Sequence, residues 1–417
     1  MRTIEGHNVK IFTDNIEQSA LDQIMTLLSI DVFSDKKIRI MPDVHAGAGC
    51  VIGFTGDLGD KVIPNIVGVD IGCGMRVIRL GRLTDIDFHA FHEHIRANVP
   101  SGMTVREDRL GFRPLAGEEM DIYREAKRLV TELHCYRDLK DSGRINRAIG
   151  SLGGGNHFIE LDHDDEGSVY LVIHTGSRNL GKQVADIYQA KAVRHLTAGA
   201  DDFEATLRRT IDEYKAAGRR SELQGVISSM RRRQSAAAPS LPSTLCYVEG
   251  ETREQYLHDM RLCQHWAVLN RRLIAMLLLR FFPEVQPTEE FESVHNYISD
   301  DNIIRKGSIS AALGERCIIP LNMRDGSLLC TGKGNSDWNC SAPHGAGRVL
   351  SRTQAYERIT MADFEASMQG IYSESVNEYT RDESPMVYKP ADEIISNIAD
   401  TVTIDSIIRP IFNFKAS

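Results

Sequence analysis

Short apolar runs alternate with glycine-rich turns along the first 80 residues. Four of these runs are rich in β-branched side chains, and the pattern predicts strands joined by tight turns. The four runs are 37–41, 50–54, 62–69 and 75–80. Further along, helical spacing of apolar positions predicts helices at 85–98 and 121–139, and the compact run 169–173 predicts another strand.

The centre of the chain changes to a long helical pattern. Residues 182–281 are predicted to be mostly helical, and strands with glycine turns return between 283 and 348. A last helical region, 360–399 with a break near Pro385, leads to a short apolar end. Strands interrupted by one helical segment predict a single α+β domain over 1–417, in which helices cover central β-sheets and 182–281 is a helical insertion.

The composition is that of an ordinary globular protein. Apolar residues make 42% of the chain and charged residues 26%, which excludes a collagen, a coiled coil or a disordered chain. The longest apolar run of the helical region, 273–279, is too short to cross a bilayer, and the N-terminus lacks the apolar core of a secretory signal. We therefore expect a cytoplasmic protein that has no contact with membranes.

The formal net charge of −9 argues against a protein coated by nucleic acid over its whole surface. A local basic groove stays possible, because binding depends on where the charges lie. The stretch 215–233 carries six basic residues and one acid, Glu222. It is interpreted either as an RNA-facing extension or as a solvated helix face.

Eight cysteines are spread along the chain, and no two of them form a CxxC pair. This spacing argues against a zinc ribbon or a thioredoxin-type redox pair. Most of the cysteines are expected to be small core residues, and one or two to be functional.

Metal-binding side chains recur in glycine-rich turns beside the predicted strands. Asp70 and Cys73 are three residues apart in one such turn, so both can reach one point, and a thiolate can bridge two ions. His157, His174 and His295 could supply imidazoles from similar turns. The set predicts a metal site, and its donors suit zinc or iron at least as well as manganese.

A second histidine spacing, in the segment FHAFHEH, is interpreted as one face of a helix. Its members are His89, His92 and His94. The segment 176–183 (GSRNLGKQ) nearly matches a phosphate-binding loop, but Gln183 stands where the magnesium-binding Ser or Thr would be. That difference argues against a Walker-type nucleotidase, although Arg178 and the backbone of this turn could still cradle a phosphate oxygen.

Basic residues beside glycines predict an anion site near His344. These residues are Lys306, Lys333, Arg348 and Arg352. His344 itself, in the segment APHGAGR, has no evident triad partners in the sequence. It could be a metal ligand, a base, or a nucleophile toward phosphorus.

Nine segments together resemble one family. They are MPDVH, GVDIGCGM, LGGGNHFIE, IHTGSRNLG, HNY, RKGS, GKGN, PHGAGRVLSR and SPMVYK, in this order from residue 41 to 389. Through these segments the chain resembles the RtcB family of GTP-dependent RNA ligases over nearly its whole length. The resemblance implies a cytosolic enzyme that joins RNA ending in a 2′,3′-cyclic phosphate or 3′-phosphate to RNA with a 5′-hydroxyl, in RNA repair or tRNA splicing.

The resemblance also implies a mechanism. In the family, a histidine attacks the α-phosphorus of GTP, and the residue that matches it is His344. The guanylate then passes to the RNA 3′-phosphate, and the 5′-hydroxyl displaces GMP. The family's two manganese ions map onto five residues, with Cys73 as the bridge. These residues are Asp70, Cys73, His157, His174 and His295.

Further roles are implied in the same way. Asn156 matches a residue that contacts the nucleotide phosphates, and Glu160 and Lys389 match residues that recognise guanine. The motif around the nucleophile adds Gly345, Ala346 and Gly347 to the nucleotide site. Lys306, Arg348 and Arg352 match basic residues that bind RNA or nucleotide phosphates. We expect Asp43 to orient a ligand without binding the metal itself.

One segment departs from the family pattern. Residues 320–327 (PLNMRDGS) replace the usual glycine-serine turn that lies against the guanylate. A divergent branch that repairs specific nicked RNAs is a hypothesis that fits this change. The family also suggests a monomer and a small activating protein, archease.

Two other functions compete with the ligase. One is a two-metal phosphodiesterase that opens cyclic phosphates without joining RNA, which would not need His344. The other is a non-catalytic RNA-binding or chaperone-associated protein that has kept the fold.

Overall fold

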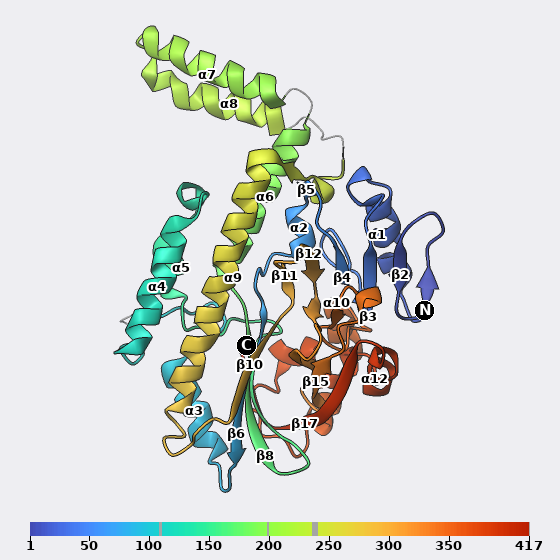
Figure 1. Cartoon of the computed structure of the whole chain (residues 1–417). Coiled ribbons are helices and arrows are strands. Elements are labelled where there is room, and N and C mark those ends of the chain that lie inside the picture. The colour runs from blue at the N-terminus through green and yellow to red at the C-terminus, as the bar shows by residue number, and fades with distance from the viewer. Residues whose placement is uncertain (108–110, 198–199, 236–240, 417) are drawn as a thin grey trace.

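The computed structural model describes residues 1–107, 111–197, 200–235 and 241–416. In this part of the chain, two large β-sheets form the frame of the molecule (Figure 1). The first has six strands in the order β1-β2-β3-β4-β12-β11, and only β2 and β3 run parallel. Its strands are β1 (Arg2–Thr3), β2 (Val9–Ile11), β3 (Ile38–His45), β4 (Ile52–Asp57), β11 (Asn296–Ile298) and β12 (Ile303–Lys306).

The second sheet has seven strands in the order β10-β6-β8-β7-β17-β15-β14, and all its described neighbours are antiparallel. Its strands are β6 (Gly74–Arg82), β7 (Phe158–His163), β8 (Ser168–Thr175), β10 (Glu289–Val294), β14 (Arg316–Asn322), β15 (Gly326–Gly332) and β17 (Val402–Lys415). Two short pairs complete the described strands. They are β13 (Ser308–Ser310) with β16 (Ser341–Pro343), and β5 (Lys61–Val62) with β9 (Val248–Glu249).

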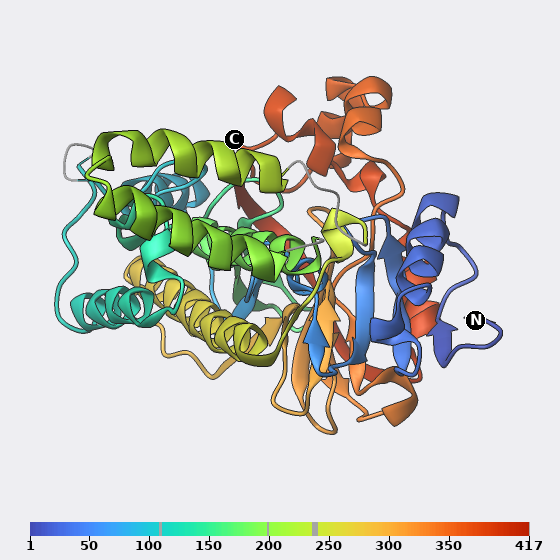
Figure 2. The same ribbon diagram turned by 90° about the horizontal axis from the view of Figure 1, so that it is seen from above.

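Several helices gather on the side of the molecule away from the first sheet, whereas α1 (Gln18–Leu28) and α12 (Ala391–Ile398) pack against β3 (Figure 2). The longest described helix, α9 (Gly250–Leu279), packs against β8 and buries side chains along most of its length. β8 itself is buried at every position, which explains its continuous apolar sequence. The other helices are α1 (Gln18–Leu28), α2 (Pro64–Val67), α3 (Phe88–Asn98), α4 (Glu118–Glu132), α5 (Ser142–Arg147), α6 (Arg178–Leu196), α7 (Ala200–Ala216), α8 (Leu223–Ser235), α10 (Arg352–Arg358), α11 (Met361–Ser367) and α12 (Ala391–Ile398).

One buried arginine on α9 forms hydrogen bonds both to the turn before β6 and to the end of β8. The Arg271 guanidinium donates to the carbonyls of Gly72 at 2.8 Å and Thr175 at 2.9 Å, and it pairs with Glu292 at 2.8 Å. An unpaired buried guanidinium would be very costly, so these contacts fix the turn before β6 relative to the end of β8. Both ends carry candidate metal ligands.

The predicted α+β class in a single domain is confirmed. The helices at 182–281 divide into two groups within the described residues. α6 and α9 belong to the core of the molecule, whereas α7 and α8 form a helical hairpin that projects from it (Figure 1). Whether 182–281 is an insertion stays an expectation.

Three parts of the predicted secondary structure were wrong. The run 62–69, predicted as a strand, is a strand only where β5 ends and then forms the helix α2. The first 80 residues include a helix, α1, whose buried positions Ala20, Ile24, Leu27 and Leu28 follow a helical period. The predicted short apolar end is instead β17, a strand of 14 residues that lies between β7 and β15. Region 360–399 is interrupted near Pro385, as predicted, because 3₁₀ turns at Glu378–Glu383 and Pro385–Val387 separate α11 from α12.

No helix in the described part of the chain combines the length and the apolar character needed to cross a membrane. All eight cysteines are free, and seven of them are buried, as expected for small core residues.

Candidate active site

Five candidate ligands come together where four segments of the second sheet meet. Asp70 and Cys73 precede β6, His157 precedes β7, His174 lies near the end of β8, and His295 follows β10. Strand pairing explains this convergence. His174 lies opposite both Met75 and Phe158, and Val294 lies opposite Gly74.

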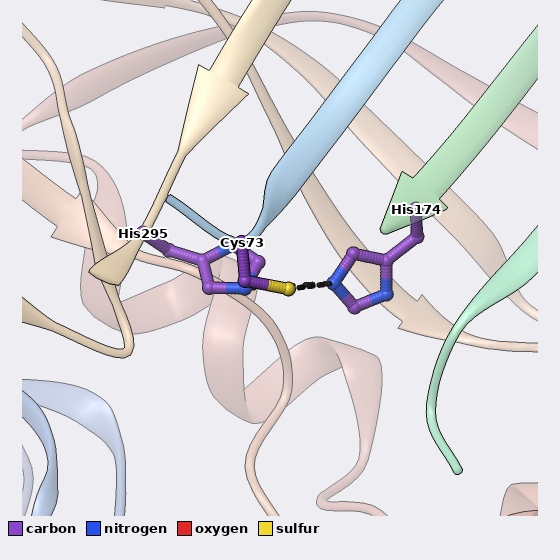
Figure 3. A group of neighbouring side chains, drawn as sticks. All are labelled: Cys73, His174 and His295. Carbon is purple, nitrogen blue, oxygen red and sulfur yellow. Dashed lines mark hydrogen bonds between the residues drawn. The ribbon is translucent and has the colours of Figure 1, made fainter. Parts of the chain in front are cut away.

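The donor atoms form two groups that share one thiol. Cys73 Sγ lies 3.4 Å from His174 Nε2 and 3.5 Å from His157 Nε2. His174 Nε2 is 3.5 Å from His295 Nε2, and Asp70 Oδ2 is 3.0 Å from His157 Nε2. Figure 3 shows Cys73 between the rings of His174 and His295. Within each group the donor atoms lie within 4.8 Å of one another, so each group could hold a metal ion.

Backbone carbonyls set the orientation of two of these imidazoles. His157 Nδ1 donates to the Leu152 carbonyl at 2.9 Å, and His174 Nδ1 donates to the Asn156 carbonyl at 3.0 Å. Each ring therefore directs Nε2 toward the centre. Burial lowers the pKa of His174 and of His295, so both rings are neutral and able to bind a metal at pH 7.

Asp70 and Cys73 are also suited to a cation. Burial opposes ionisation of Asp70, but the hydrogen bond and charge of His157 outweigh it and lower the pKa of this carboxyl. Asp70 Oδ1 is buried with no hydrogen-bond partner among the described residues. Burial and the neighbouring Asp70 raise the pKa of the Cys73 thiol, and a bound cation would displace its proton.

A pocket of about 900 Å³ opens beside this cluster and is lined by His174. It contains many of the residues expected to bind nucleotide or phosphate. These residues are Asn156, Glu160, His344, Gly345, Ala346, Gly347, Arg348 and Arg352, and Phe158 lines the pocket beside them. The rings of His344 and His295 are 4.9 Å apart, so the pocket and the metal cluster form one continuous site.

His344 is held by a buried carboxylate. Its Nδ1 lies 2.7 Å from Asp43 Oδ2, and its backbone N–H donates to the same oxygen at 3.2 Å. Nδ1 is the donating nitrogen, so Nε2 keeps its lone pair. Asp43 was expected to orient a metal ligand, but its partner is His344. Gly347 permits this approach, because a Cβ there would lie 2.4 Å from the Asp43 carbonyl oxygen.

Glu160 and Lys415 are buried side chains that line the pocket. Asn413 Nδ2 donates to Glu160 at 2.5 Å, and burial raises the pKa of this carboxyl to about 7 against the opposing effects of Asn413 and Lys415. The Lys415 ammonium lies 5.6 Å from the centre of the Phe158 ring and 3.1 Å from Glu383. Lys415 was missed in the sequence, because the end of the chain was taken as a short apolar tail.

Two predicted basic contacts lie outside the pocket lining. Lys389 Nζ donates to the carbonyls of Pro42 at 2.9 Å and Asn15 at 3.1 Å. Lys306 Nζ donates to Ala48 O at 2.7 Å and Asn65 O at 3.0 Å. Both ammonium groups are buried and serve the fold, so the direct guanine and phosphate contacts expected of them do not follow from this geometry.

The remaining basic candidates differ in their freedom. Arg348 lines the pocket but is committed to Glu383 at 3.3 Å and to the Asp382 carbonyl at 2.7 Å. The Arg352 side chain is 64% exposed, and its ion pair with Asp382 is long, at 3.5 Å. Its guanidinium can therefore reach a phosphate. Lys333 Nζ donates to Ala399 O, away from the pocket.

Two alternatives from the sequence have structural explanations. Arg178 donates to Gly102 O at 2.6 Å and Ser151 Oγ at 3.2 Å, so its guanidinium holds two loops together. The FHAFHEH histidines lie on α3, as predicted, and His94 Nε2 contacts the Leu277 carbonyl at 2.9 Å.

The segment that departs from the family pattern forms a wall of the pocket. It is the turn between β14 and β15, and Asn322 closes it by accepting N–H groups from Arg324 at 3.0 Å and Asp325 at 2.9 Å. Its pocket-lining residues are Pro320, Leu321, Asn322, Met323, Gly326 and Ser327. Ser327 Oγ is buried without a hydrogen-bond partner among the described residues.

Comparison with known proteins identifies the class of enzyme to which this fold and this site belong. Residues 23–416 match the family described as tRNA-splicing ligase RtcB. The chain belongs to this family and is an RNA ligase. It is 28% identical to the RNA-splicing ligase RtcB of Escherichia coli (strain K12), over 99% of this chain and 98% of that protein. It is 26% identical to the tRNA-splicing ligase RtcB of Archaeoglobus fulgidus, over 92% of this chain and 86% of that protein.

Proposed function

We propose that this RNA ligase uses GTP and manganese, and that it joins 2′,3′-cyclic phosphate or 3′-phosphate ends to 5′-hydroxyl ends through a guanylate on His344. The observation that carries the proposal is the 2.7 Å contact between Asp43 and His344 Nδ1. An imidazole held at Nδ1 by a carboxylate, with Nε2 open to a pocket, is suited to attack phosphorus. A metal-binding cluster lies directly beside it.

The two donor groups would hold the two Mn²⁺ ions. One group is Cys73, His174 and His295, and the other is Asp70, Cys73 and His157. The unpartnered Asp70 Oδ1 supports this fit, since a cation would satisfy that oxygen. When bound, two such ions neutralise a triphosphate and stabilise its leaving pyrophosphate.

The chain's own residues would position the nucleotide. Glu160 can accept the two N–H donors on the Watson–Crick edge of guanine, which adenine does not offer in that arrangement. Phe158 supplies an apolar ring for stacking, and Lys415 lies beside it. Arg352, on the rim, can hold an RNA phosphate. The guanylate would pass to the RNA 3′-phosphate, and the 5′-hydroxyl would then displace GMP.

The intact mass of the protein after incubation with GTP and Mn²⁺ tests this function. We expect a gain of one guanylate that is lost in acid, as for a phosphoramidate, and no gain for His344→Ala. Absence of the adduct in wild type with metal bound, even after an archease-like activator is added, would contradict the proposal. The need for that activator and the monomeric state remain predictions.

The competing hydrolase would need the metal cluster but not the Asp43–His344 pair. Its test is the opening of a cyclic phosphate end by His344→Ala at the wild-type rate with no joining. The buried carboxylate behind His344 favours the ligase, because burying Asp43 has a desolvation cost that a hydrolase would gain nothing from.

Nucleotide binding should depend on pH through Glu160. The pKa of this carboxyl is raised to about 7, and only its ionised form accepts both guanine donors. GTP affinity should therefore rise as pH increases from 6 to 8. Titration of GTP binding at several pH values checks this, and Glu160→Gln should bind weakly with no such rise. An equal rise in the variant would assign the effect to another group.

The projecting hairpin offers a separate test of RNA binding. Arg231, Arg232 and Arg233 are exposed near the end of α8. Replacing all three by Gln should weaken RNA binding and make the slope of log K against log salt shallower by about two to three. A matched control replaces Arg124, Lys127 and Arg128, which are exposed on α4. Equal slopes in both variants would identify the stretch as a solvated face.

A further inference from the structure

A single residue, Asp43, orients two imidazoles toward the same pocket. Its carboxylate holds His344 Nδ1 at 2.7 Å. Its backbone carbonyl accepts a hydrogen bond from His45 Nδ1 at 2.9 Å. Both rings line the pocket, and His45 is the last residue of β3, so the strand fixes its position. A carbonyl only accepts, so His45 carries its proton on Nδ1 and presents Nε2 as a lone pair.

The surroundings of His45 keep its ring neutral. Burial lowers the pKa of His45, and His344 and Arg348 lower it further, while the hydrogen bond and charge of Asp43 oppose them. Glu17 also faces this part of the pocket, but its carboxylate accepts the Ala46 N–H at 2.8 Å. No hydrogen bond to His45 Nε2 is found among the described residues. His45 is therefore a neutral base near a reacting centre.

In the sealing step of the proposed reaction, the proton of the 5′-hydroxyl needs an acceptor. When a 5′-hydroxyl attacks the activated 3′-phosphate, its proton has to leave. The imidazoles of the metal cluster direct Nε2 toward the proposed ions, and Glu383 is occupied by Lys415, Tyr388 and Arg348. His45 Nε2 is free of hydrogen bonds among the described residues and faces the same pocket.

We propose that His45 Nε2 is the general base of the sealing step, which rests on the function proposed above. The 5′-oxygen forms a bond to the phosphorus of the RNA 3′-phosphate, the bond from that phosphorus to the oxygen of GMP breaks, and GMP leaves with the electron pair. The hydroxyl proton moves to His45 Nε2 and is later released to water. No oxidant or further reactant is needed.

The test isolates sealing from guanylate formation. Wild-type enzyme first makes RNA that carries the guanylate on its 3′-phosphate, in the absence of a 5′-hydroxyl strand. That RNA and a 5′-hydroxyl strand are then given to wild type, His45→Gln, His45→Ala and His89→Gln, the last being an exposed histidine on α3. Single-turnover rates are measured from pH 5.5 to 8.5.

We expect the two His45 variants to seal at least about 100-fold more slowly, with His89→Gln unchanged. The fall in wild-type rate at low pH should vanish in His45→Gln, and added imidazole should partly rescue His45→Ala. Unchanged sealing in the His45 variants would overturn the proposal. So would a weaker affinity for RNA at an unchanged maximal rate, which would indicate a binding role. Failure of wild type to make the guanylated RNA would count against the proposed function instead.

Discussion

Cys73→Ala should abolish metal binding by the cluster and should reduce guanylate formation to below detection. Cys73 is the only residue shared by the two donor groups of the site, so its removal takes one ligand from each. Loss of a partner that only supports a metal ligand costs about 10–100-fold in affinity or activity, and loss of a bridging ligand should exceed that. Metal content by mass spectrometry and the guanylate adduct are the two measurements.

The fold should survive this change, because Cys73 is a small residue in a turn whose backbone is held by Arg271 at Gly72. Cys263→Ala is a matched control: it removes an equally buried thiol from α9 and should keep its metal and activity. Full metal content in Cys73→Ala would remove this thiol from the metal site. Loss of metal in both variants would point to a general loss of packing.

The candidate metal ligands could be predicted from the sequence because each lies in a short turn beside a strong strand pattern. Asp70 and Cys73 are close along the chain, and His157 and His174 precede and end neighbouring strands. Such side chains meet wherever the strands pair, even if the order of strands is unknown. The pairing itself, with β17 between β7 and β15, could not be predicted, because β17 pairs with β7 across more than 200 residues of sequence.

The roles of the basic residues could not be predicted from their sequence motifs. Lys306 and Lys389 stand in motifs like those of Arg348, yet their ammonium groups bind backbone carbonyls. A lysine beside glycine gives no information on whether tertiary structure supplies it with carbonyl partners. Lys415 reaches the pocket only because β17 extends to the end of the described chain beside Phe158.

The partner of Asp43 was equally beyond the sequence. Asp43 and His344 are 301 residues apart, and nothing in either motif indicates the other. Their contact changes Asp43 from a supporting residue of the metal cluster to one that determines the state of the nucleophile.

Asp43→Asn should slow guanylate formation by about 10²–10⁴-fold while the protein keeps its fold and its metal. An amide can present its N–H₂ group to His344 Nδ1, which would move the imidazole proton to Nε2 and remove the attacking lone pair. Even with the correct tautomer, an amide cannot stabilise the positive charge that develops on the ring as it attacks phosphorus. In serine proteases the same exchange of carboxylate for amide behind a histidine costs about 10⁴.

The measurement is the single-turnover rate of guanylate formation at saturating GTP, with metal content and thermal unfolding recorded for each variant. Asp43 is buried, so its replacement could also change the stability of the fold, and thermal unfolding controls for this. The amide of Asp43→Asn has nearly the volume of the carboxylate and lacks its charge. Asp43→Ala should be less stable as well as slow, since it leaves a cavity and an unpaired His344 Nδ1. A guanylation rate in Asp43→Asn within a few-fold of wild type would mean that His344 does not depend on this carboxylate, and the role proposed for the pair would be wrong.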